Sequence, residues 1–163
     1  MKNTALTAVA LVAMPVLGIN GQSREEVSAI GSLRAIISAE LTYAGVCVSG
    51  GYAISLEDLA RPERRDGGRF IGPDLGINGT THRGYKFTVA KGARKGVSDV
   101  STAGATCNGS KANPASSFFA SAEPADPSTG DRFFAADERG IIFFSAKPIP
   151  NPIVESATVV RYQ

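Results

Sequence analysis

The residues that could carry out chemistry are few and scattered along the sequence. Histidine occurs once, so a two-histidine metal site is excluded, and any Ser–His–acid triad would depend on His82. His82 lies in the polar run 80–83, with no nucleophile motif beside it. Cys47 and Cys107 are far from the CxxC spacing of redox and zinc sites. We therefore predict that the protein is not an enzyme and has no catalytic residue, cofactor or metal.

Four carboxylates bracket one expected strand: Asp126, Asp131, Asp137 and Glu138. Calcium binds loop carboxylates and carbonyls of this kind. Their spacing does not match a calcium-binding loop, and the same residue types are ordinary turn formers. We interpret them as turn residues.

Two triplets, beginning at Asn78 and Asn108, match the pattern for N-glycosylation. Such short patterns also occur by chance. Neither triplet by itself predicts a modification.

The composition indicates a single domain with a hydrophobic core, and it does not indicate a strongly charged binding partner. The chain has 163 residues, 43% of them hydrophobic, and a formal net charge of +2. This length suits a single domain. The small net charge gives no indication of nucleic-acid binding.

Residues 1–21 have the composition of a signal peptide. Lys2 precedes an apolar run from Ala5 to Leu17, and Gly18 follows. A membrane-spanning helix needs about 20 apolar residues, and this run is shorter. We expect a signal peptide or short hydrophobic segment at 1–21 and a globular domain at 22–163. The alternative is an uncleaved helix continuing into the next segment, which would then be the protein's only membrane contact.

The two cysteines are a candidate disulfide. If the protein is exported, a bridge between Cys47 and Cys107 is the default for such a pair. The alternative is two unrelated buried thiols.

Residues 23–45 are predicted to form a long amphipathic helix. Ser23 and Glu26 have the spacing of a capping box, and Gly45 suits the position that closes a helix. Apolar residues at three- and four-residue steps predict one buried stripe. The stripe consists of Val27, Ile30, Leu33, Ile37, Leu41 and Ala44.

Short strands are predicted after this helix. Ser55 is expected to cap a short helix at 56–60, and the turn at 137–140 is expected to join a β-hairpin. A helix followed by antiparallel strands predicts an α+β fold with the helix on one face of a small antiparallel sheet. The expected strands are 84–90, 97–107, 116–122, 132–136, 141–146 and 156–161.

From Arg24 to Phe144 the sequence resembles the globular part of type IV pilins and type II secretion pseudopilins. The resemblance rests on the order of five segments: EEVSAIGSLRAIISAELTYA, GGYAISLEDLA, GYKFTVAKG, ATCNGS and SSFFASAEPADPSTGDRFFAADERGIIFF. It implies a pilin-like headgroup, with a long N-terminal helix on an antiparallel sheet and with Cys47 joined to Cys107. The hydrophobic segment with a glutamate at its fifth residue, which starts the pilin helix, is not present in the sequence.

The resemblance also implies a structural role. We expect an exported bacterial protein of the periplasm or cell surface, such as an accessory subunit of a type IV pilus or type II secretion pseudopilus. Its expected partners are other pilin-like subunits or the pilus and secretion machinery. The alternative is a soluble periplasmic binding or adaptor module.

Overall fold

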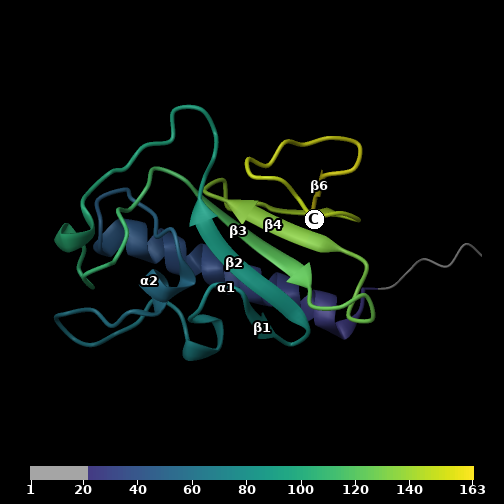
Figure 1. Ribbon diagram of the computed structural model, residues 1–163, viewed down its shortest axis with the longest axis horizontal. Coiled ribbons are helices and arrows are strands. Elements are labelled where there is room, and N and C mark those ends of the chain that lie inside the picture. Colours follow the sequence, from purple (N-terminus) through teal and green to yellow (C-terminus); the bar gives the residue numbers. More distant parts are fainter. Residues whose placement is uncertain (1–21) are drawn as a thin grey trace, which may run out of the picture.

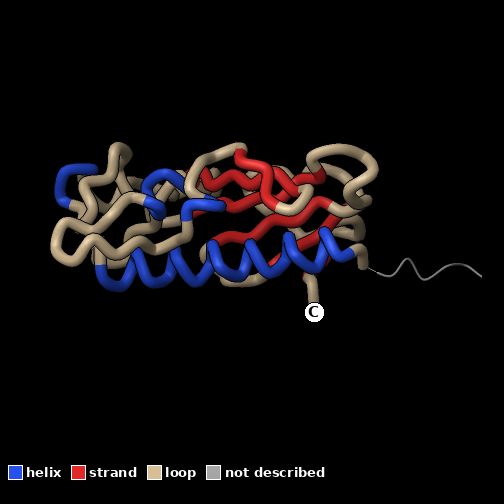
Figure 2. Tube along the Cα trace, turned by 90° about the horizontal axis from the view of Figure 1, so that it is seen from below, coloured by secondary structure: helices blue, strands red, loops and turns tan. Residues whose placement is uncertain are grey.

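The computed structural model describes residues 22–163. The expected signal peptide or hydrophobic segment at 1–21 lies outside these residues. In chain order, helix α1 (Arg24–Val46) and the short α2 (Leu56–Ala60) come first, and the strands follow. Helix α1 runs along one side of the sheet (Figure 2).

Helix α1 begins where the sequence predicts. The Ser23 hydroxyl accepts a hydrogen bond from the Glu26 backbone N–H at 3.0 Å, which is the N-cap contact. The second half of the capping box is replaced, because the Glu26 carboxylate lies 3.5 Å from the Arg132 guanidinium. At the other end the helix continues past Gly45, and Cys47 is its C-cap.

The predicted architecture, a long N-terminal helix packed on a small sheet, is wrong. Helix α1 has 23 residues and begins at Arg24, because the Ser23 cap ends the helical hydrogen bonding there. The sheet has six antiparallel strands in sequential order. The fold is thus α+β, with a main helix of moderate length and a six-stranded sheet, so it has neither a long helix nor a small sheet.

The sheet is an antiparallel meander in which each strand pairs with the next. Gly140 has a φ of +70° and closes the predicted hairpin, where its N–H donates to the Asp137 carbonyl at 2.9 Å. Figure 1 shows the strands crossing in front of α1. The strands are β1 (Thr80–His82), β2 (Tyr85–Lys91), β3 (Phe118–Pro124), β4 (Phe133–Asp137), β5 (Ile142–Ser145) and β6 (Val160–Arg161).

Each face of the sheet packs against another part of the chain. Helix α1 contacts β2, β3 and β4 on one face, where Phe87 and Phe134 belong to the main core. On the other face, Ile149, Ile153 and Val159 from the C-terminal loop pack against Phe143 and form a second core. The loop, coloured yellow, lies beside β4 in Figure 1. A loop of the same chain therefore covers the β3–β5 part of the sheet face turned away from α1, and Lys86 on β2 stays exposed.

Three predictions about strands need correction. Residues 97–107 form no strand; they hold an isolated bridge at Asp99 and the 3-10 helix η2 (Ala103–Ala105). The predicted strand at 156–161 is reduced to β6, because residues 156–159 form a turn in which the Ser156 N–H donates to the Val159 carbonyl at 3.0 Å. Strand β1 and the 3-10 helix η1 (Pro73–Leu75) were not predicted.

The buried stripe of α1 is rotated from the predicted one. Val27 and Leu41 are 56% and 51% exposed. Ile36 and Tyr43, which were not placed in the stripe, are fully buried. The buried side of α1 also includes two carboxylates, Glu26 and Glu40, which a pattern of apolar residues cannot predict. It consists of Glu26, Ala29, Ile30, Leu33, Ile36, Ile37, Ala39, Glu40, Tyr43 and Ala44.

Two leucines on α1 provide a test of this assignment. Leu33 is 0% exposed, so we expect Leu33→Ala to lower the free energy of unfolding by about 2–5 kcal/mol. The matched control Leu41→Ala should change it by less than about 0.5 kcal/mol. Urea denaturation followed by circular dichroism measures both. Equal losses in the two variants would contradict the observed orientation of the helix.

Candidate functional site

The structure does not place His82 in a catalytic arrangement. It is the last residue of β1, half-buried and opposite Tyr85 in the strand register. Within residues 22–163, no hydrogen bond or ion pair joins its side chain to an acid or a nucleophile. A general base must reach the proton that it removes and is usually oriented by a second group. The contacts of His82 therefore give no support to a triad.

The four candidate calcium carboxylates are separated and mostly engaged with other groups. Asp126 accepts a hydrogen bond from the Ser128 backbone N–H at 2.8 Å and shapes a turn. Asp137 binds the Arg139 guanidinium at 2.8 Å, and Glu138 pairs with Arg94. In the described part of the chain, no cluster of three or more His, Cys, Asp or Glu side chains could hold a metal ion.

Both glycosylation-type asparagines are used inside the fold. The Asn108 amide is buried and donates to the Asp58 carbonyl at 2.7 Å. The Asn78 side chain accepts from the Val89 N–H at 2.9 Å and donates to the Val89 carbonyl at 2.8 Å, so it extends the hydrogen bonding of β2. These contacts give both asparagines a structural role within the fold.

Cys47 and Cys107 form a disulfide, the one pairing predicted from the sequence. Cys47 is the C-cap of α1, and Cys107 follows η2 in the long loop before β3. The bridge closes a segment with a sequence separation of 60 residues, which contains α2, β1 and β2. It therefore fixes the end of the helix to a loop that has little regular structure of its own.

Loss of this disulfide should destabilise the folded protein. We expect Cys47→Ser combined with Cys107→Ser to lower the free energy of unfolding by about 2–5 kcal/mol, because the unfolded chain gains loop entropy. Urea denaturation with and without reductant measures this loss. The double variant serves as the control, since reductant should leave its unfolding unchanged. The prediction fails if reduction of the wild type frees two thiols without shifting its midpoint.

A buried acidic group lies on α1, two turns before the disulfide. Glu40 is 0% exposed; one oxygen accepts from the Ala53 N–H at 2.8 Å, and the other has no hydrogen-bond partner. Burial raises the pKa of Glu40 well above its usual range, the Ala53 N–H opposes this shift, and the Asp58 carboxylate adds to it. Burial likewise raises the pKa of Tyr43, one turn along α1, to about 12. The protonated form of Glu40 is therefore the one that fits the core.

Glu40 should make stability fall as pH rises. Its pKa is higher in the folded than in the unfolded chain, so the folded state is favoured most below the usual carboxyl value of about 4.5. As pH rises from there toward the raised pKa, the protein loses up to about 1.4 kcal/mol per pH unit. We expect the neutral isostere Glu40→Gln to match the wild type near pH 4 and to exceed it increasingly toward pH 8.

Urea denaturation across this pH range measures the difference between the two proteins. Glu25→Gln is the control, because Glu25 is exposed on the same helix, and its difference from the wild type should stay nearly constant. A Glu40→Gln difference that does not grow with pH would contradict the buried, protonated carboxyl.

The exposed side of α1 carries several apolar residues and little charge. Val27, Leu41 and Val46 are 56%, 51% and 67% exposed, and from Val27 to Val46 the exposed residues include one charged side chain, Arg34. A surface helix normally presents charged and polar residues to water. We call this surface the outer face of α1; it consists of Val27, Gly31, Arg34, Ala35, Ser38, Leu41, Thr42, Gly45 and Val46.

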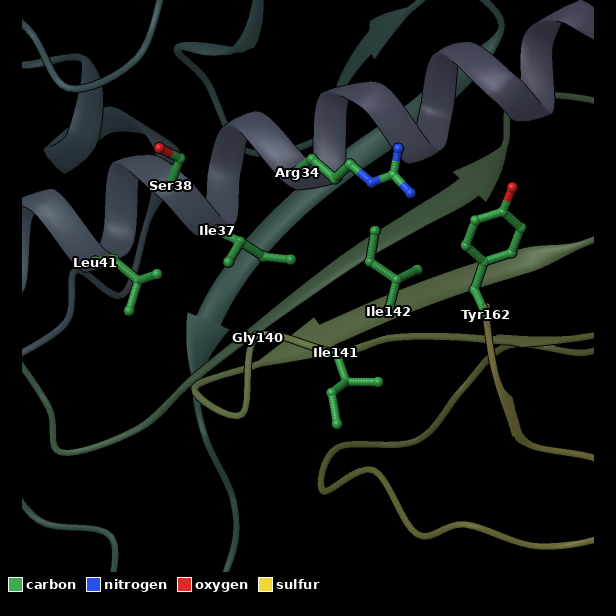
Figure 3. A pocket seen from close by; sticks show the side chains of 8 residues that line it. All are labelled: Arg34, Ile37, Ser38, Leu41, Gly140, Ile141, Ile142 and Tyr162. Carbon is green, nitrogen blue, oxygen red and sulfur yellow. The ribbon is translucent and has the colours of Figure 1, made fainter.

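A groove of about 390 Å³ borders the outer face. Figure 3 shows Arg34, Ile37 and Leu41 of α1 along one wall. The turn between β4 and β5 and Tyr162 form the opposite wall (Figure 3). The groove was not predicted from the sequence, because Tyr162 is far from the helix in the chain. Arg34 could have been singled out as the only basic residue between Glu26 and Glu40.

No protein-family model, curated protein or solved structure matches this chain. None of the helices within residues 22–163 is both long enough and apolar enough to cross a membrane.

Proposed function

We propose that this chain is a non-enzymatic, exported, pilin-like structural or interaction protein that acts as an accessory subunit of a type IV pilus or type II secretion pseudopilus. Its partners are then other pilin-like subunits or components of the pilus or secretion machinery. Its place is the periplasm or the cell surface of a bacterium. The sequence resemblance first suggested this role.

The observation that carries the proposal is the outer face of α1. Burying the exposed parts of Val27, Leu41 and Val46 against a partner is favourable by about 25 cal/mol per Å² of apolar surface. Small residues on this face would let a partner approach the helix closely. The space beside Gly31 and Gly45 is open, because a side-chain carbon added at either position would meet no atom within 4 Å. A nearly uncharged helix surface of this kind is suited to contact with another protein.

The disulfide supports the exported location. Structural disulfides form and persist in oxidising compartments, and thiols are kept reduced in most cytosols. Cys47 and Cys107 are the only cysteines of the chain, and both are used in the bridge. The protein thus has the cysteine chemistry that a periplasmic or surface subunit needs.

The groove beside α1 favours a second candidate, a periplasmic binding or adaptor module. Its volume of about 390 Å³ falls within the range of small-molecule sites. In that case the outer face of α1 would flank a ligand site.

Fractionation of the native bacterium tests the leading proposal. Surface filaments sheared from the cells, and complexes of the secretion machinery, should contain the chain when they are probed with a specific antibody. We expect Ala35→Glu to remove the chain from these fractions, because a charge on the outer face opposes burial in an interface. The matched control Ala125→Glu places the same change on an exposed loop after β3 and should leave the association intact.

Circular dichroism of the purified variants separates loss of assembly from loss of folding. Mass spectrometry of the native N-terminus gives an independent result. A chain found only in the soluble periplasm, with its N-terminus near Ser23, would overturn the subunit role and favour the binding module.

A further inference from the structure

The groove beside α1 has an apolar interior. Ile37 and Ile142 are nearly buried at its base, and Leu41 and Ile141 extend its apolar surface (Figure 3). From Arg34 to Leu41 the helix rises about 10 Å, at about 1.5 Å per residue. The groove can therefore take a ligand of roughly that apolar length.

One end of the groove carries a positive charge. Among the described residues, Arg34 is the only charged one that lines it, and its guanidinium carbon lies 5.9 Å from the centre of the Tyr162 ring. The ring is held in place, because the Tyr162 hydroxyl lies 3.2 Å from the Gln22 side-chain oxygen and its N–H donates to the Ile142 carbonyl at 2.8 Å. Figure 3 shows the guanidinium directed toward this end.

Comparison with the other arginine–aromatic pairs shows what Arg34 lacks. Arg139 lies over Phe143 and binds Asp137 at 2.8 Å. Arg132 lies over Phe144, with the Glu26 carboxylate at 3.5 Å. Within residues 22–163, Arg34 has the aromatic contact but takes part in no ion pair.

We propose that the groove binds an unbranched apolar carboxylate of the medium-chain fatty-acid class, with its carboxylate on Arg34 and its alkyl chain along Ile37 and Leu41. Arginine presents a planar pair of N–H donors that matches a carboxylate. The apolar wall removes the alkyl chain from water. This inference does not rest on the proposed function.

The walls favour an alkyl chain over a peptide ending in a carboxylate. A peptide of similar length would bury backbone N–H and C=O groups, each of which needs a hydrogen-bond partner. Beyond Arg34, the described side chains lining the groove offer two polar groups, the Ser38 and Tyr162 hydroxyls, and the Tyr162 hydroxyl already donates to Gln22. An alkyl chain makes no such demand.

Titration of the purified full-length chain with sodium decanoate, kept below its micelle concentration, tests the proposal. Proton–nitrogen NMR spectra should show saturable shifts centred on Ile37, Leu41 and Ile141. Arg34→Gln should weaken binding at least about tenfold, because the charge-assisted hydrogen bonds are lost. Arg34→Lys should give an intermediate loss. The matched control Arg24→Gln, an exposed arginine of the same helix outside the groove, should bind like the wild type.

Two comparison ligands complete the experiment. Decanol, which lacks the charge, should bind at least about tenfold more weakly than decanoate. Equal binding of decanol, equal binding by Arg34→Gln, or the absence of saturable shifts would overturn the proposal. An apolar tripeptide with a free C-terminal carboxylate that binds more tightly than decanoate would assign the groove to peptide ends and would also overturn the fatty-acid assignment.

Discussion

The packing of α1 across one face of the sheet is the contact on which the rest of the structure depends. Leu33, Ile36 and Tyr43 are completely buried on the helix side. On the sheet side, the buried residues of β3 and β4 include small ones, Ala120 and Ala136, which leave room for the helix. A helix that buries this face must turn its opposite side outward, and that side becomes the outer face of α1 and the edge of the groove.

Polar groups inside this contact are matched to specific partners. Glu26 lies beside Arg132, and Glu40 accepts from the Ala53 N–H in the segment before α2. A buried carboxyl destabilises a core unless hydrogen bonding or protonation compensates for its lost hydration. Polar contacts therefore hold the helix at two points. Glu26 contacts Arg132, just before β4, and Glu40 contacts Ala53, in the segment that follows Cys47. Such contacts restrict the rotation of a helix that apolar packing alone would hold less strictly.

Local signals in the sequence were sufficient where one short motif decides the structure. Ser23, Ser55 and Gly140 correctly marked a helix start, a second helix start and a hairpin turn, since each acts through contacts only a few residues away. The rotation of α1 could not be predicted this way. Glu40 is buried because Ala53 and the surrounding fold satisfy it, whereas Leu41 is exposed although it is apolar.

The groove depends on distant parts of the chain, whereas the unpredicted strand β1 depends on the neighbouring strand β2. Strand β1 is short and polar, and it is a strand because Thr80, Thr81 and His82 pair with β2. The groove forms where Tyr162 comes to lie near Arg34. The groove has no local pattern, so the sequence indicated the disulfide cysteines but not the surface beside the helix.

The disulfide has a mechanical consequence. It joins the last turn of α1 to the loop before β3, so a pulling force along the backbone can pass from Cys47 to Cys107 through the covalent bridge. The enclosed segment, with α2, β1 and β2, is then bypassed by the tension and cannot be drawn out to its full contour length. Within residues 22–163, the oxidised chain under load would extend through α1 and through the part of the chain from β3 onward.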